Sequence, residues 1–123
     1  MTNLYHEITP EGFGIAIEKD KDIASVKSPF QQIDIFHSRA FGNVMTLDGL
    51  MMTTERDEFF YHEMIVHIPM LTHPNPENVL VIGGGDGGTV REILKHPTVK
   101  KVDMVEIDGD VIELCKKYQP TMS

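Results

Sequence analysis

The amino-acid sequence predicts an α/β protein, in which a small N-terminal antiparallel β domain precedes the start of a Rossmann-like, doubly wound sheet. Three observations support this fold class. β-forming residues dominate the first 54 positions, apolar strands and amphipathic helices alternate afterwards, and a run of glycines follows the first of the later strands. We therefore expect a β-strand domain over residues 1–54 and the first part of a nucleotide-binding domain over residues 55–123.

Strand patterns fill the first domain. Residues 13–18 are rich in β-forming side chains, and residues 31–38 place Ile33 and Ile35 two positions apart. Because successive side chains of a strand point to opposite faces, this alternation is typical of a half-buried strand.

A hairpin is predicted at Asp48-Gly49, which stands between two β-forming runs, residues 43–47 and 50–53. An Asp-Gly pair suits a tight type I′ turn, since glycine accepts a positive φ angle without a steric cost. The two runs should therefore pair as neighbouring antiparallel strands.

The pattern becomes helical at Thr54. Thr54 followed by Asp57 three positions later resembles a capping box, which predicts a helix start here. Apolar residues then recur at helical spacing from Phe60 to Ile68, and Pro69 should kink or end the helix.

The second domain shows the order strand, glycine turn, helix, strand, helix. Strands are predicted at residues 79–82 and 102–107, and helices at residues 89–96 and 109–118. This is the βαβα start of a doubly wound sheet. Because two parallel strands make a poor sheet, we expect a truncated protein, or one that completes its sheet with a partner.

Composition and charge exclude several classes. The chain is 41% apolar, with 19 acidic against 11 basic residues and a net charge of −8. Such a surface repels phosphate backbones and anionic membranes and attracts cations, although solubility alone also explains it. A single cysteine, Cys115, allows no intrachain disulfide. Without a signal-like start or an apolar stretch of ~20 residues, the chain is expected to be cytoplasmic, with no membrane or nucleic-acid partner.

The glycine run satisfies the pattern G-x-G-x-x-G through Gly83, Gly85 and Gly88. Glycines permit a tight turn and a close approach of the backbone to a ligand, and the following helix N-terminus adds a partial positive charge. Dinucleotide dehydrogenases and AdoMet-dependent enzymes both use this spacing, so the spacing by itself does not separate them.

Asp86, inside the turn, discriminates between these classes. A dinucleotide would place its pyrophosphate against this carboxylate, and at ~4 Å the repulsion is about 4 kcal/mol for an effective dielectric constant of ~20. A cationic nucleoside, such as decarboxylated AdoMet with its sulfonium and ammonium groups, would be attracted instead. The alternative is that Asp86 caps the helix, but the dense glycine setting favours a ligand role.

A second acid, Glu106, ends the second predicted strand about 20 residues after the glycine turn. An acid at this distance commonly binds the two ribose hydroxyls of an adenosine. Asp108, two positions on, shares its face of the strand, but for Asp108 we favour an N-cap of the last helix.

His62 and His67 lie on the helix before the glycine turn. A zinc helix requires histidines four positions apart, whereas these are five apart, so we expect no metal site. A single histidine in such a helix is more often structural than functional.

Taken together, these segments resemble the polyamine aminopropyltransferase (spermidine synthase) family over nearly the whole chain, as its N-terminal portion. The match is carried by an ordered set of motifs: FQQI (30–33), LDG (47–49), TERDE (54–58), YHEM (61–64), HPNP (73–76), VIGGGDGG (81–88), REILKHP (91–97) and EID (106–108). The resemblance implies a sheet of the AdoMet-methyltransferase type and transfer of the aminopropyl group of decarboxylated AdoMet to putrescine. The products would be spermidine and methylthioadenosine.

The resemblance also implies residue roles. Gln31 would bind the nucleoside co-substrate from the β-strand domain, and Glu106 would hold its ribose hydroxyls. Asp86 would face the aminopropyl group and the polyamine, while His62 and Tyr61 would line the polyamine channel. A homodimer or homotetramer is expected, with no tightly bound cofactor.

Members of the family are considerably longer than this chain. The acid that deprotonates the attacking amine would lie beyond Ser123, so no catalytic base is assigned and we expect little or no transferase activity from the chain alone. Putrescine, agmatine and cadaverine all remain open as the acceptor.

Two other classes remain open, and the first is an enzyme of another kind, either an AdoMet-dependent methyltransferase or an NAD-dependent dehydrogenase. A methyltransferase usually has an acid two residues before the first glycine, where this chain has Val81. A non-catalytic module for nucleotide binding or dimerisation is the other alternative.

Overall fold

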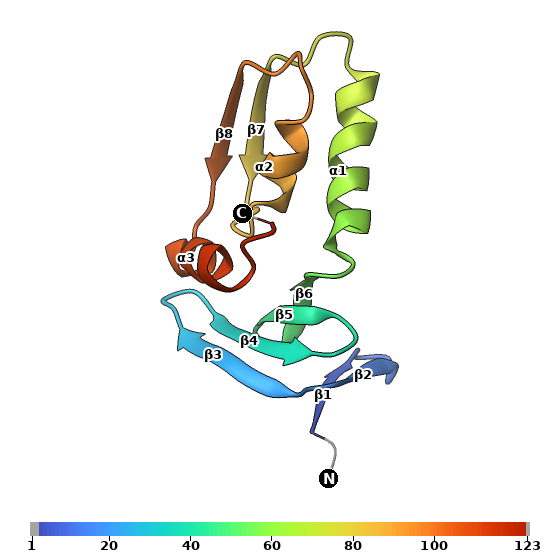
Figure 1. Cartoon of the computed structure of the whole chain (residues 1–123), viewed down its shortest axis with the longest axis vertical. Helices are drawn as coiled ribbons and strands as arrows, with labels where there is room; N and C mark the ends of the chain where they lie inside the picture. Colours follow the sequence, from blue (N-terminus) through green and yellow to red (C-terminus); the bar gives the residue numbers. More distant parts are fainter. Residues whose placement is uncertain (1–2, 123) are drawn as a thin grey trace. The chain divides into compact units, whose positions relative to one another are not determined.

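The computed structural model describes residues 3–122 and divides the chain into two compact units, residues 1–56 and 57–123. Figure 1 labels their helices and strands. The sequence pattern suggested a division after Thr54, and the compact units divide after Arg56. Each unit is described by itself.

The first unit consists of antiparallel strands in two sheets. β1 and β2 form a pair, and the other four form a meander in the order β3-β4-β5-β6. The strands are β1 (Leu4–Ile8), β2 (Gly14–Glu18), β3 (Lys21–Lys27), β4 (Gln32–Ser38), β5 (Gly42–Leu47) and β6 (Leu50–Thr54). The strand patterns of the sequence predicted β2, β4, β5 and β6 but not β1 and β3, whose segments contain charged residues such as Glu7, Lys21 and Asp22.

The predicted hairpin between β5 and β6 is confirmed. Leu47 pairs with Leu50, and both turn residues have positive φ angles, 50° at Asp48 and 82° at Gly49. These angles define the type I′ class. The Asp48 carboxylate also accepts a hydrogen bond of 2.9 Å from the backbone N–H of Gln32, which ties the turn to the start of β4.

The predicted capping box is wrong. Thr54 is the last residue of β6 and pairs with Val44, and the carboxylate of Glu55 accepts a hydrogen bond of 2.8 Å from the Asn43 amide. Helix α1 (Glu58–Thr72) begins only after Asp57, whose side chain makes no cap bond. Pairing with β5 therefore takes precedence over the local capping pattern.

Pro69 does not end α1, contrary to one of the two expected outcomes. The helix continues to Thr72, whose hydroxyl donates a 2.7 Å hydrogen bond to the Ile68 carbonyl, and the His73 amide bonds to the Pro69 carbonyl at 3.0 Å. Proline removes one backbone hydrogen bond here, while burial of the neighbouring Met70 side chain holds the last turn in place.

The second unit has the predicted βαβα order after α1. Strands β7 (Asn78–Ile82) and β8 (Lys101–Val105) pair in parallel, and helices α2 (Gly88–Ile93) and α3 (Gly109–Tyr118) follow them. Helix α2 ends three residues earlier than expected, since the amides of Lys95 and His96 donate to carbonyls three residues back instead of four. No helix within residues 3–122 is long and apolar enough to span a membrane.

The core of the second unit lies on one face of this sheet, where α1 and α2 pack (Figure 1). Val66 and Met70 of α1 meet Val81 of β7 and Ile93 of α2. The alternate strand residues point the other way, and Ile82 is 84% exposed. Helices α1 and α2 therefore pack on one face of the β7–β8 sheet, and the glycine turn follows the end of β7.

Met70→Ala should lower the free energy of unfolding by about 2 kcal/mol or more, because it leaves a cavity in this core. Met70 is 7% exposed, whereas Met64 on the same helix is 61% exposed. The same change at Met64 should cost less than about 0.5 kcal/mol. Urea unfolding followed by circular dichroism measures both, and equal losses would contradict the assignment of the core.

Candidate functional site

The glycine turn lies at the carboxyl ends of the two parallel strands. The Gly83 amide donates to the Val105 carbonyl at 2.8 Å, which joins the start of the turn to the end of β8. Within the turn, the Gly87 amide donates to the Gly84 carbonyl at 3.0 Å. Ligands of open α/β sheets bind at this edge, so the turn occupies the position expected of a binding loop.

Two of the glycines make room for side chains of the protein itself. A Cβ atom on Gly88 would collide with the His62 ring, and one on Gly85 would lie 3.0 Å from the Glu106 carboxylate and from Val111. Sequence reasoning attributed the glycines to close approach of a ligand. The structure adds a second cause, which is the packing of these side chains against the backbone of the turn.

Asp86 is held by two donors. Its Oδ1 accepts a hydrogen bond of 2.7 Å from the Gly88 amide and lies 3.2 Å from Nε2 of His62. Burial alone would raise the pKa of Asp86, but these two contacts outweigh it and lower the pKa, so the carboxylate is ionised. Asp86 therefore binds the first amide of α2, as the capping alternative expected, although the N-cap residue itself is Gly87. The ligand role of Asp86 stays a prediction.

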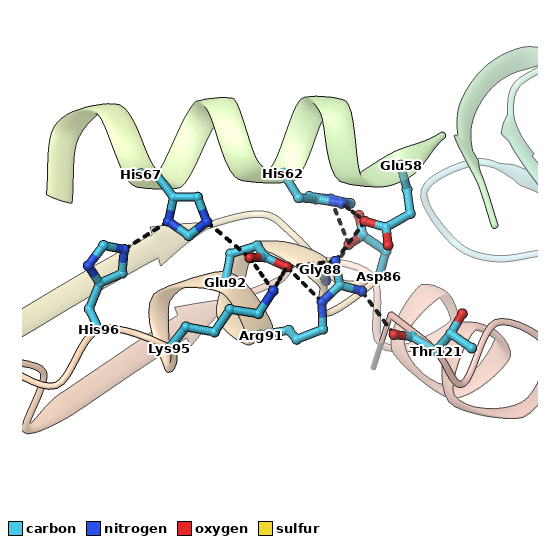
Figure 2. Close-up of polar contacts among 10 residues, drawn as sticks. All are labelled: Glu58, His62, His67, Asp86, Gly88, Arg91, Glu92, Lys95, His96 and Thr121. Carbon is cyan, nitrogen blue, oxygen red and sulfur yellow. Dashed lines mark hydrogen bonds and ion pairs between the residues drawn. The ribbon is translucent and has the colours of Figure 1, made fainter. Parts of the chain in front are cut away.

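His62 is buried between two carboxylates (Figure 2). Its Nδ1 lies 2.5 Å from Oε2 of Glu58, one helical turn earlier on α1, and its Nε2 faces Asp86. Burial disfavours a charged imidazole, but hydrogen bonds and attraction from Asp86 and Glu58 outweigh it and raise the pKa of His62. The histidine expected to be structural or to line a channel thus contacts the acid of the glycine turn.

Arg91 extends this cluster along α2. Its guanidinium pairs with Glu58 at 2.8 Å and with Glu92 at 3.0 Å, and it donates to the Thr121 carbonyl at 2.9 Å. Burial would raise the pKa of Glu58, but Arg91 and His62 together lower it. No role was predicted from the sequence for Glu58, Arg91 or Glu92. Glu58 nevertheless stands four residues before His62, which is the spacing of facing side chains on a helix.

The row of charges continues beyond Arg91 (Figure 2). The buried carboxylate of Glu92 pairs with Lys95 at 2.6 Å and with His67 at 3.2 Å, and Nδ1 of His67 lies 2.9 Å from Nε2 of His96. His67 therefore pairs with Glu92 of α2, whereas His62 contacts Glu58 and Asp86.

Glu106 is bound to the same turn. Its two oxygens accept hydrogen bonds from the amides of Gly85 at 2.9 Å and Asp108 at 3.1 Å. Asp108 in turn accepts from the Asp110 amide at 3.1 Å, which confirms the predicted N-cap of α3. A carboxylate is thus anchored where the second strand ends, beside the turn that carries Asp86.

The two remaining predicted site residues are Tyr61 and Gln31. Tyr61 is largely exposed, and its ring meets the edge of the His62 ring with centroids 5.3 Å apart. Gln31 belongs to the first unit and directly precedes β4. Its backbone N–H donates to the Ser28 hydroxyl at 3.1 Å. The ligand roles of both residues stay predictions.

Cys115 should be inert to thiol reagents in the folded chain. Its side chain is fully buried on α3, and burial, with further contributions from the charges of Asp86 and Glu106, raises its pKa to about 12. Ellman's reagent at pH 8 should detect this thiol only after unfolding. A cysteine placed at the exposed Lys116 position should react at once, and equally fast labelling of Cys115 would contradict the packing of α3.

The cluster should stabilise the fold most between about pH 4.5 and 6.5. Glu58 and Asp86, with lowered pKa values, lose their contribution as pH falls through those values. The raised pKa of His62 gives a contribution complete below about pH 6.5 that is lost as pH rises through the folded-state value.

Urea unfolding across this range should therefore show the largest loss for His62→Gln inside the window and smaller losses on either side. The same change at the exposed His73 should alter the free energy of unfolding by no more than about 0.5 kcal/mol at any pH. A loss for His62→Gln that is independent of pH would argue against the ionised cluster.

Comparison with known proteins covers both units. Residues 58–123 match the spermine/spermidine synthase domain, and residues 4–55 match the spermidine synthase tetramerisation domain. The chain is 56% identical over 111 residues to a polyamine aminopropyltransferase of Bacillus cytotoxicus, and 51% identical over 119 residues to that of Bacillus subtilis. These alignments cover 90% and 97% of this chain but only 40% and 43% of the relatives.

Solved structures give the same result. The spermidine synthase of Thermotoga maritima matches 98% of this chain with a TM-score of 0.94 and 49% identity, and 43% of that protein is covered. A spermidine synthase in complex with the transition-state analogue AdoDATO matches with a TM-score of 0.95 and 50% identity, over 98% of this chain and 42% of that protein. The chain spans about two fifths of the length of its relatives, and it belongs to the spermine/spermidine synthase family.

Proposed function

We propose that this chain supplies the nucleoside-binding part of a polyamine aminopropyltransferase, most specifically a spermidine synthase. The reaction transfers the aminopropyl group of decarboxylated AdoMet to putrescine and releases methylthioadenosine. Relatives named polyamine aminopropyltransferase, and a similar spermidine synthase solved with AdoDATO, support the proposal.

The observation that carries the proposal is the ionised Asp86 inside the glycine turn, with Glu106 anchored beside it. Two carboxylates at this edge favour a ligand with positive charge and no phosphate, because like charges close together in a partly buried site repel strongly. They also disfavour AdoMet relative to its decarboxylated form, since AdoMet carries a carboxylate of its own. We infer that Glu106 binds the ribose and that Asp86 faces the aminopropyl end.

The leaving group of this reaction requires no acid catalyst. A neutral amine attacks the carbon next to the sulfonium, the carbon–sulfur bond breaks, and its electron pair leaves with methylthioadenosine. Alignment of the two reactants then supplies much of the rate. Gln31, Tyr61 and His62 are proposed to position the reactants, and we propose that the base that takes the amine proton belongs to a part of the enzyme outside this chain.

The first unit is proposed to assemble copies of the protein. Its residues match a domain described as the spermidine synthase tetramerisation domain, which supports a homo-oligomer and favours a tetramer over a dimer. Putrescine is the proposed acceptor, with spermidine as the product.

Isothermal titration of the chain with decarboxylated AdoMet and with methylthioadenosine tests the electrostatic argument. Asp86→Asn should weaken binding of the cationic ligand by about tenfold or more, which corresponds to about 1.4 kcal/mol, and change methylthioadenosine binding much less. Asp103→Asn, at an exposed carboxylate of β8, serves as the control and should change neither. Equal losses for both ligands would refute the charge argument, and tighter binding of AdoMet than of its decarboxylated form would favour a methyltransferase.

A further inference from the structure

Both ring nitrogens of His62 face carboxylate oxygens. Nδ1 lies 2.5 Å from Glu58 and Nε2 lies 3.2 Å from Asp86 (Figure 2). A neutral imidazole has one N–H donor and one acceptor nitrogen, whereas an ionised carboxylate can only accept. A neutral ring would therefore turn a lone pair toward one of the two acids. The geometry fits an imidazolium, which donates at both nitrogens.

The acid at Nδ1 has a support of its own. Oε2 of Glu58, the same oxygen that faces His62, also accepts from Nη2 of Arg91 at 2.8 Å. The Glu58 side chain is only 9% exposed, and a carboxylate removed from water without a partner would take up a proton. An arginine side chain is always charged in proteins, so it keeps Glu58 ionised. Charges therefore alternate along Arg91, Glu58, His62 and Asp86.

We propose that Glu58 and Arg91 are positioning residues of the site: they hold the His62 ring as an imidazolium whose Nε2–H donates to Asp86, and they thereby fix the Asp86 carboxylate within the glycine turn. Asp86 then keeps one orientation before any ligand arrives. A fixed dipole or charge of this kind needs no reorganisation when the ligand binds. The part of the proposal that concerns the ligand rests on the proposed function.

The surroundings of His62 agree with this assignment. Glu58 and Tyr61 approach from α1, Asp86 from the glycine turn, and Arg91 approaches from α2 through Glu58. Two negative charges touch the ring, while the one positive charge is separated from it by a carboxylate. The backbone of Gly88 lies against the ring so closely that a Cβ atom there would collide with it. The ring is thus confined in orientation as well as in charge.

Nitrogen-15 spectra of the histidine rings, recorded on the purified 123-residue chain between pH 5 and 9, test the first part directly. The wild-type signal of His62, identified by its loss in His62→Gln, should show protons on both nitrogens at pH 7. Glu58→Gln should lower its titration midpoint by about one pH unit or more, because a neutral amide replaces the closer anion. Glu63→Gln removes the same charge at an exposed site of the same helix and should leave the midpoint in place.

Arg91→Lys provides a second variant that retains the charge. Lysine lacks the planar fork that reaches Glu58 and Glu92 together, so the midpoint of His62 should fall by less than in Glu58→Gln. A wild-type His62 with a single ring proton at pH 7 would overturn the proposal, even if the Glu58 variant fails to fold. An unchanged midpoint in a folded Glu58→Gln chain would overturn it as well.

Titration with decarboxylated AdoMet and methylthioadenosine tests the second part. Glu58→Gln should weaken binding of the cationic ligand by about tenfold, as expected for disturbing one charge-assisted hydrogen bond, and leave binding of neutral methylthioadenosine nearly unchanged. If the ratio of the two affinities stays the same while the His62 midpoint falls, Glu58 does not position Asp86. If the wild type binds neither ligand, the proposed function fails, whereas the ring spectra still decide the role of Glu58.

Discussion

The second unit depends on the contacts of the buried His62 ring with two carboxylates, those of Glu58 and Asp86. His62 joins α1 to the glycine turn through Asp86, and Glu58 joins the same helix to α2 through Arg91. Each member would be costly to bury alone, because burial disfavours an isolated charge. Together they alternate in sign, so each is stabilised by a neighbour. Helix α1, which precedes the nucleotide fold, thereby contributes side chains to the candidate site.

The same contact gives the glycine turn a second reason for its composition. A binding loop needs glycine where the backbone approaches a ligand, and Gly88 and Gly85 also leave space for the His62 ring and the Glu106 carboxylate. The backbone of the turn therefore packs directly against the His62 ring and the Glu106 carboxylate. The glycine turn, the end of β8 and helix α1 are therefore joined through Asp86, Glu106 and His62.

Local sequence rules predicted much of the architecture. The Asp48-Gly49 turn, the parallel order of β7 and β8, and the bounds of α3 with its Asp108 cap all follow from short-range patterns. Local rules failed where distant pairing competes with them. Thr54 belongs to a strand because it pairs with Val44, and β3 forms beside β4 although its own residues are largely polar.

The candidate site divides in the same manner. The glycine spacing and the position of acids after each strand determine that carboxylates gather at one edge of the sheet, since the ends of parallel strands meet there. The sequence by itself therefore determined the fold class, the edge of the sheet at which the candidate site lies and the acidic character of that edge.

Only the tertiary structure decided which of these charges touch. Glu58 and His62 belong to one helix, whereas Arg91 lies 33 residues after Glu58 and Asp86 lies 24 residues after His62. Their pairing depends on how α1 packs across α2, and that packing is set by core residues such as Val66 and Ile93. Periodicity alone did not show which face of α1 is buried, since Phe60, Met64 and Ile68 are exposed while Val66 and Met70 lie in the core. The buried face and its partners are decided by the packing of whole elements.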